Sequence, residues 1–336
     1  MNVLLLQLDG SLPNIALMRL AAHHRERGDR VELRRAGNEA AVERQLWDEH
    51  DCVYASLLFE RTRPVAERLL RAHPQAIVGG TGWDLRSNLE QLGVGLTQDY
   101  SIYPSFRSSI GFLQRGCRFK CPFCVVPKKE GPIRQEQTVE QLWRGPEHPK
   151  HLIVLDNDFF GNPAWPDRIA EIREGRFRVN FCQGINARCL DERTAAAIAS
   201  VDYRDARMQQ RRIYTAWDNR RDEERLFRGL RLLVDAGVKP NHIMVYILIG
   251  YWAGETHEDR DHRRHKLREF GARPYPMPYT RRPELVAFQR WVVQGYDKAI
   301  PWETFWAEAR GEPRRLQIRP TPQLRLPTIG PDNAFE

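Results

Sequence analysis

Short apolar runs, each about the length of a β-strand, recur along most of this chain, with helix-like segments between them. In the first hundred residues these runs fall at 2–8, 30–33, 51–58 and 75–78. An amphipathic helix is expected over 17–27, and a second helix is expected to end near residue 71. Strands that alternate with helices form parallel sheets covered on both faces. The sequence therefore predicts an α/β fold that begins with a Rossmann-like parallel sheet in a domain spanning residues 1–103.

The pattern continues after a Pro-bearing linker that ends near residue 106. Six more strands are expected at 109–114, 151–155, 177–181, 212–216, 242–249 and 272–277. The clearest helix between them spans 222–236, where apolar residues line one face and Gly237 suits the position after the helix end. Six such units predict a partial (β/α)6 barrel of TIM type over residues 104–282. Active groups of such a barrel lie at the carboxyl ends of its strands. Residues 283–336 are expected to form a C-terminal extension of aromatic-rich helices and a Pro/Arg-rich tail.

Three cysteines lie within eight residues at the end of the first of these six strands. Cys117, Cys121 and Cys124 have the spacing C-x3-C-x2-C. An iron–sulfur cube usually takes four protein thiolates, so three would leave one iron open to another ligand. A structural zinc site normally needs four protein ligands, and no second pair of cysteines lies near this run. A redox C-x-x-C motif would leave Cys117 unexplained. The spacing favours an iron–sulfur cluster.

The cysteine run, with Phe123 before its last cysteine, resembles the signature of the radical S-adenosylmethionine (radical SAM) enzymes. The resemblance implies a 4Fe–4S cluster on Cys117, Cys121 and Cys124, with S-adenosylmethionine bound to the fourth iron. It implies that an external electron donor such as flavodoxin or ferredoxin reduces the cluster. S-adenosylmethionine would then be cleaved to a 5′-deoxyadenosyl radical. Phe123 would lie near the adenine.

The residues after Cys124 resemble the subgroup of this family that carries an N-terminal cobalamin-binding-like domain. Members of that subgroup often have Asp-x-His-x-x-Gly, whose histidine binds cobalt. Here the corresponding run is Asp9-Gly-Ser-Leu-Pro-Asn14, without histidine. We expect a Rossmann-like domain that lacks cobalamin, and cobalamin binding stays an open alternative. Cys52 stands alone in this domain, which argues against the second cluster of the methylthiotransferases.

Polar residues gather at the predicted carboxyl ends of the strands, where a polar ligand could bind across the mouth of a barrel. By the resemblance, Asp156 and Asn157 would hold the methionyl amino group, and Asn186 and Arg188 would reach the ribose or carboxylate. Arginine suits a bidentate carboxylate contact. Gln183 is a further polar candidate. For the aspartates, helix capping is the alternative explanation.

The last two strands supply the remaining candidates. Tyr246 and Gly250 belong to a strand that resembles the one packing beside adenine, although Tyr246 stands where the family has its first glycine. Asp218 and Tyr279 would face the substrate, and we expect them to be catalytic.

Composition is consistent with a soluble cytoplasmic enzyme. The chain has no run of 18 apolar residues, so no membrane span is expected. Lys and Arg total 52 against 44 Asp and Glu, a net charge of +8 that permits an anionic partner. A small-molecule or peptide substrate is slightly favoured over nucleic acid. Two alternatives remain open: a cobalamin-dependent radical methyltransferase, and a non-enzymatic iron–sulfur protein that binds nucleic acid.

Overall fold

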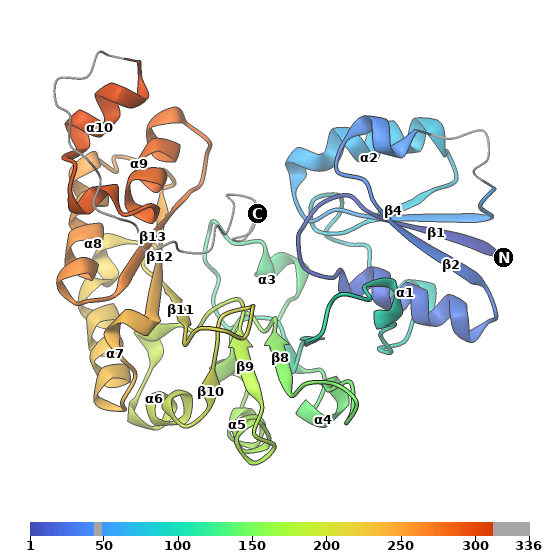
Figure 1. The fold of residues 1–336 in the computed structure, drawn as a ribbon, viewed down its shortest axis with the longest axis horizontal. Helices are drawn as coiled ribbons and strands as arrows, with labels where there is room; N and C mark the ends of the chain where they lie inside the picture. Colours follow the sequence, from blue (N-terminus) through green and yellow to red (C-terminus); the bar gives the residue numbers. More distant parts are fainter. Residues whose placement is uncertain (44–48, 312–336) are drawn as a thin grey trace. The chain divides into compact units, whose positions relative to one another are not determined.

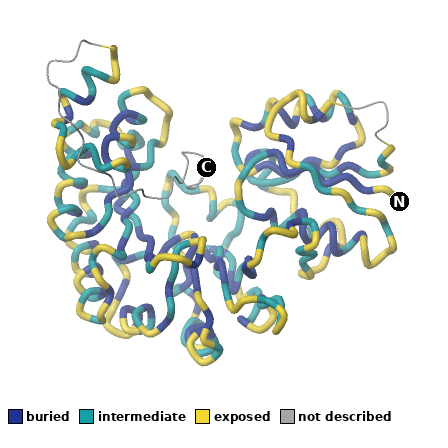
Figure 2. Tube along the Cα trace, viewed as in Figure 1, coloured by how far each residue is buried: buried dark blue, intermediate teal, exposed yellow. Residues whose placement is uncertain are grey.

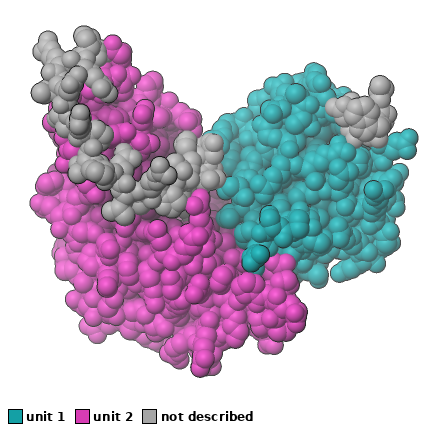
Figure 3. Space-filling view, viewed as in Figure 1, with its two compact units in different colours: residues 1–107, 325–336 teal, residues 108–324 magenta. Residues whose placement is uncertain are grey.

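The computed structural model describes residues 1–43 and 49–311. Their contacts divide the chain into two compact units, one of residues 1–107 and one that begins at Ser108 (Figure 3). The sequence placed the boundary at 103/104. The predicted Pro/Arg-rich tail lies outside the described residues.

The first unit contains a four-stranded, fully parallel sheet in the order β2-β1-β3-β4 (Figure 1). Its strands are β1 (Asn2–Gln7), β2 (Arg30–Arg35), β3 (Cys52–Ser56) and β4 (Ile77–Gly79). Helices α1 (Ile15–Glu26) and α2 (Arg63–Ala72) cover opposite faces of this sheet. Alternate residues of β1 explain this, because Leu4 and Leu6 pack in the core beneath α2, whereas Val3 and Leu5 pack beneath α1. All four strands predicted from the sequence are present.

The second unit contains two parallel sheets and one short antiparallel pair. The first sheet has the order β10-β9-β8-β5, the second has the order β11-β12-β13, and β6 pairs with β7. The strands are β5 (Ser109–Gly111), β6 (Gln114–Arg115), β7 (Arg134–Gln135), β8 (His151–Val154), β9 (Arg178–Phe181), β10 (Asp202–Tyr203), β11 (Ile213–Ala216), β12 (Ile243–Ile249) and β13 (Arg273–Pro278). The helices are α3 (Val126–Lys129), α4 (Val139–Leu142), α5 (Trp165–Glu174), α6 (Glu192–Ala199), α7 (Glu223–Asp235), α8 (His257–Glu269), α9 (Pro283–Val293) and α10 (Trp302–Ala309).

All six strands predicted for this half of the chain are present and parallel to their neighbours. They do not form one hydrogen-bonded sheet, because the short strand β10 takes the edge of β9 that a continuous sheet would offer to β11. One backbone hydrogen bond, from Ile185 N to Tyr214 O at 2.8 Å, still links the end of the first sheet to the second. One apolar core with residues from both sheets and from each of the helices α4 to α10 holds the unit together (Figure 2).

Alternate residues of strand β12 face the buried core of the second unit. Ile243, Val245, Ile247 and Ile249 are fully buried in the core, and the residues between them are only partly buried. A period of two follows from the strand geometry. Helix α7 precedes β12 in the chain. It begins one residue later than predicted and is followed by Gly237 at φ +101°, a conformation that glycine adopts without strain.

None of the helices in the described part of the chain combines the length and the apolar character that a membrane span requires.

Candidate metal centre

The loop that carries the three cysteines is closed by its own stem. Strands β6 and β7 pair on either side of it, and the Cys117 N–H donates to Gly131 O at 3.3 Å. Gly116 has φ +86°, and a Cβ there would lie 2.2 Å from the carbonyl oxygen of Pro132. Only glycine fits this close approach of two backbones. The arrowheads of β8 and β9 point toward α3, which continues this loop after Cys124 (Figure 1). The loop therefore lies at the carboxyl ends of the parallel strands.

An ion pair joins the two ends of the loop. Arg115 Nε and Nη2 donate to the two carboxylate oxygens of Glu130 at 2.5 and 2.6 Å. The Arg115 guanidinium also lies over the Phe112 ring, 4.2 Å from its centroid. Bidentate pairs of this type fix geometry as well as adding stability. We call the pair of Arg115 and Glu130 the stem clasp.

All three thiols are partly buried. Burial raises the pKa of Cys117 to about 11, and the Phe119 N–H, which donates to Cys117 Sγ at 3.4 Å, opposes that rise. Burial also raises the pKa of Cys121; the Asp218 carboxylate raises it further, and the Arg188 guanidinium lowers it. The Cys124 N–H donates to Cys121 O at 3.0 Å, which folds the second half of the motif into a turn. Thiols held in this way need a positive partner, such as a metal, to become thiolates.

The segment after β8 anchors the loop from one side. Asp156 is 3% exposed, and its two oxygens accept from Leu113 N at 2.8 Å and Gln114 N at 3.2 Å. Burial raises the pKa of Asp156 to about 8, and these two hydrogen bonds oppose the rise. Both oxygens thus fix the backbone that leads into the cysteine loop. Asn157, beside it, is half-buried.

Asp158 binds the loop itself. Its side chain is 3% exposed and pairs with Arg118, with 2.9 Å between Arg118 Nε and Asp158 Oδ2. The backbone N–H of Arg118 donates to the same oxygen at 3.3 Å. The residue directly after Cys117 is therefore tied to the end of β8.

The segments after β9 and β11 bring charged groups to Cys121. Arg188 Nε donates to Asn186 Oδ1 at 3.0 Å, and Arg188 Nη1 donates to Asp222 Oδ2 at 2.7 Å. Burial raises the pKa of Asp218 to about 6, against the opposing charges of Arg188 and Arg263. Of the predicted residues, Arg188 and Asp218 thus lie near Cys121, and Asn186 holds the Arg188 side chain.

Aromatic rings connect the loop to the ends of β12 and β13. Phe123 lies 5.4 Å from Tyr251 and 6.4 Å from Trp252 between ring centroids, and Tyr251 lies 4.7 Å from Tyr279. Trp252 Nε1 donates to Asp218 O at 2.6 Å, which joins this aromatic group to the charged one. Tyr279 is 52% exposed, so the group is open to solvent on one side.

The remaining three predicted cofactor-binding residues make other contacts or face solvent. Tyr246 stacks on Tyr214 at 5.8 Å and lies four residues before Gly250, which is about 13 Å along a strand. Gln183 is exposed. Gly250 has φ +78°, and its N–H donates to Glu255 Oε2 at 2.5 Å, so it shapes the turn after β12.

Sequence reasoning missed the stem clasp and the rings of Tyr251 and Trp252. A signal for the clasp was present, because Arg115 and Glu130 have opposite charges and flank the cysteine run. It also missed Gln114, whose buried side-chain oxygen and nitrogen have no hydrogen-bond partner among the described residues. Only the fold shows that a two-stranded stem brings these residues to the loop.

Within the described ranges, no three His, Cys, Asp or Glu side chains converge as they would around a single metal ion. This does not count against a cube, because each thiolate there binds a different iron, so the sulfurs lie farther apart. Three partly buried thiols on a fixed loop fit the donor set of such a cluster.

The first unit offers a different set of residues at the point where its strand order reverses, which is where ligands bind in such sheets. The Asn14 side chain donates to Ser56 Oγ at 2.9 Å, and the Tyr103 hydroxyl donates to Gln7 Oε1 at 2.8 Å. The carboxylate of Asp9 accepts from two backbone N–H groups, at 2.7 and 3.0 Å. These side chains occupy the position themselves and include no imidazole, so they do not fit histidine-bound cobalamin.

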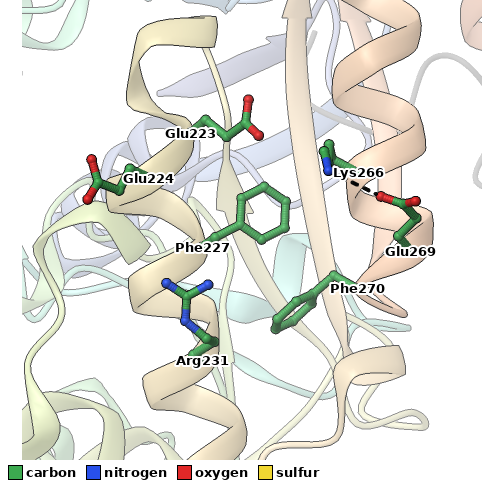
Figure 4. A pocket seen from close by; sticks show the side chains of 7 residues that line it. All are labelled: Glu223, Glu224, Phe227, Arg231, Lys266, Glu269 and Phe270. Atoms are coloured by element: carbon green, nitrogen blue, oxygen red, sulfur yellow. Dashed lines mark ion pairs between the residues drawn. The ribbon is translucent and has the colours of Figure 1, made fainter.

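A pocket of about 600 Å³ lies between α7 and α8 (Figure 4). Phe227 and Phe270 form its apolar part, and Lys266 pairs with Glu269 at its rim. None of the predicted site residues lines this pocket.

Comparisons with protein-family models, with curated proteins and with solved structures found no match to this chain.

Proposed function

We propose that this chain is a radical SAM enzyme. The observation that carries the proposal is the placement of three thiols on a stem-closed loop at the carboxyl ends of parallel strands. Polar and aromatic side chains from five strand ends, those of β8, β9, β11, β12 and β13, lie around that loop, which is what a polar cofactor with a flat base requires. The finer fold proposal is that β5, β8, β9, β11, β12 and β13 form one open partial barrel, interrupted by β10.

In this proposal Cys117, Cys121 and Cys124 hold three irons of a 4Fe–4S cluster. When bound and reduced, such a cluster would supply the one electron that cleaves S-adenosylmethionine to methionine and a 5′-deoxyadenosyl radical. Arg188 would bind the methionyl carboxylate while Asp222 and Asn186 hold its guanidinium in place. Phe123, Tyr251 and Trp252 would pack around adenine. Asp156 would act by positioning the loop, because both of its oxygens are already used by the backbone.

Asp218 is the best-placed group to hold or move a proton near a substrate. Its raised pKa, about 6, means that it exchanges protons close to neutral pH. Tyr279, half-exposed beside Tyr251, would contact the substrate. We propose a small-molecule or peptide substrate, and an external protein such as flavodoxin or ferredoxin as electron donor.

The test is anaerobic reconstitution of the full chain with iron and sulfide, followed by a strong reductant and S-adenosylmethionine. We expect about four irons per chain and release of 5′-deoxyadenosine. Replacing the three loop cysteines by Ala should abolish both, whereas the matched control Cys52→Ala, in the first unit, should retain both. A full cluster in the triple variant would refute the proposal.

A further inference from the structure

Two arginines meet at the amino ends of β11 and β13, the end of the second sheet opposite to the cysteine loop. Arg212 directly precedes β11, and Arg273 is the first residue of β13. Arg212 Nη1 and Arg273 Nε both donate to the same carbonyl oxygen, Asn241 O, at 3.0 and 2.9 Å. Two cations therefore converge on one neutral acceptor.

Neither guanidinium has a carboxylate partner among the residues that the structure describes. The second hydrogen bond of Arg212 also goes to a neutral group, because its Nη2 donates to Gln210 Oε1 at 3.0 Å. The Asp205 carboxylate raises the pKa of Arg212, but its Oδ1 accepts from the backbone N–H groups of Gln209 and Gln210 at 2.8 and 3.3 Å. Three of the ten N–H donors of the two guanidiniums take part in hydrogen bonds within the described chain.

The position is sheltered, which makes the missing counter-charge costly. Arg212 is only 6% exposed, and Arg273 is partly buried. Burial lowers the pKa of Arg212, and the charge of Arg273 lowers it further. Two like charges that are both removed from water oppose folding unless an opposite charge joins them.

The neighbouring groups add positive charge. A single carboxylate, Asp202, is shared by Arg204 at 2.7 Å, Arg211 at 3.3 Å and Arg178 at 3.5 Å. After burial, the strongest influences on the pKa of His242 are four cations, Arg212, Arg211, Lys239 and Arg273, and all of them lower it. The six cations named here face two carboxylates, Asp202 and Asp205.

We propose that Arg212 and Arg273 form a binding site for a phosphate group, at the end of the second unit opposite to the cysteine loop. Guanidinium groups present planar, paired donors that match the oxygens of phosphate, and they are less strongly hydrated than ammonium groups. A dianion would neutralise both arginines at once, which a single carboxylate would not. The phosphate belongs to a small molecule or to a nucleic acid, and the chemistry of recognition is the same for both. The inference does not depend on the cluster.

The test uses the full, reconstituted chain, with pyrophosphate as the probe and chloride at matched ionic strength as the reference. Pyrophosphate should bind the unaltered chain and raise its unfolding temperature, because a ligand that binds only the folded state stabilises it. Arg273→Gln should weaken binding by about tenfold or more, since it removes charge-assisted hydrogen bonds. The matched control Arg225→Gln removes one exposed positive charge from α7 and should leave binding unchanged.

Stability without any anion provides a second readout. Arg273→Gln removes a like charge beside Arg212, so its unfolding temperature at low salt should equal or exceed that of the unaltered chain. Arg212→Gln should also lose the response to pyrophosphate, if it folds. A short RNA carrying a 5′-phosphate identifies the source of the phosphate: Arg273-dependent binding of RNA alone would assign the site to nucleic acid and still support it. Absence of binding by both probes, or equal binding by Arg273→Gln and Arg225→Gln, would overturn the proposal.

Discussion

The stem clasp offers a direct test of how the cysteine loop is held. In Glu130→Gln the carboxylate that receives both guanidinium hydrogen bonds is replaced by a neutral amide. The two side chains are 20% and 11% exposed. An exposed ion pair contributes about 0–1 kcal/mol to stability, and removing one partner of a fully buried pair costs about 3–5 kcal/mol. The loss for this partly buried pair should lie between these limits. We therefore expect the stem to lose about 2 kcal/mol.

That loss predicts a kinetic effect. Since about 1.4 kcal/mol corresponds to a factor of ten, an opened stem should become roughly 30-fold more populated. The assay is anaerobic release of iron from the reconstituted protein to a chelator, followed by absorbance. Glu130→Gln should release iron about ten- to thirtyfold faster than the unaltered chain, if release proceeds through stem opening.

Glu136→Gln is the matched control. It removes the same charge from the same neighbourhood, but Glu136 lies 4.0 Å from Arg115, at the limit of an ion pair. Its release rate should change less than threefold, as expected for a contact worth about 0.5 kcal/mol or less. Equal rates for the two variants would show that net charge, and not the clasp, controls the loop.

Three further predictions concern single residues. Because the folded-state pKa of Asp218, about 6, lies above its unfolded value, its contribution to stability is complete below about pH 4 and is lost as pH rises through 6; urea unfolding of the metal-free chain should show this decline, and Asp218→Asn should show a smaller decline between pH 4 and 6, the remainder coming from Asp156 with its pKa of about 8. Gly116→Ala places a Cβ 2.2 Å from a carbonyl oxygen and should prevent cluster assembly, whereas Gly131→Ala, at φ +71° with open space around it, should cost only about 1 kcal/mol and retain the cluster, as iron content will show. Burial raises the pKa of Cys182 to about 12, so iodoacetamide at pH 8 should label exposed Cys189 in the native protein and leave Cys182 unlabelled until unfolding, as peptide mass analysis can follow.

Much of the fold could be predicted because its signals are local. The continuous apolar run that forms β12 can be recognised in the sequence, and so can the apolar stripe of α7 with Gly237 after it. The two-sheet arrangement is not legible. It depends on whether Asp202–Tyr203 or Ile213–Ala216 takes the free edge of β9, and both segments have suitable residues for pairing.

The site residues also fall into those that local sequence identifies and those that only long-range packing brings together. The spacing of the cysteines is a local property, so the sequence alone nominates them. The partners of Asp156 and Arg188 are set by long-range packing: backbone N–H groups 43 and 42 residues away for the first, and a carboxylate 34 residues away for the second. Tyr246 is predicted from the resemblance of its strand to the one that packs beside adenine, whereas its ring stacks on Tyr214 and contacts Tyr275 on the face of the sheet.

The central claim is that three cysteines leave one iron of a cube open to S-adenosylmethionine. The most direct measurement is the electron paramagnetic resonance spectrum of the reduced, reconstituted protein, recorded with and without S-adenosylmethionine. We predict a 4Fe–4S signal whose g values shift when S-adenosylmethionine is added, because the open iron changes its ligands. A 4Fe–4S signal that stays unchanged at saturating S-adenosylmethionine, or the absence of any cluster signal, would contradict the account.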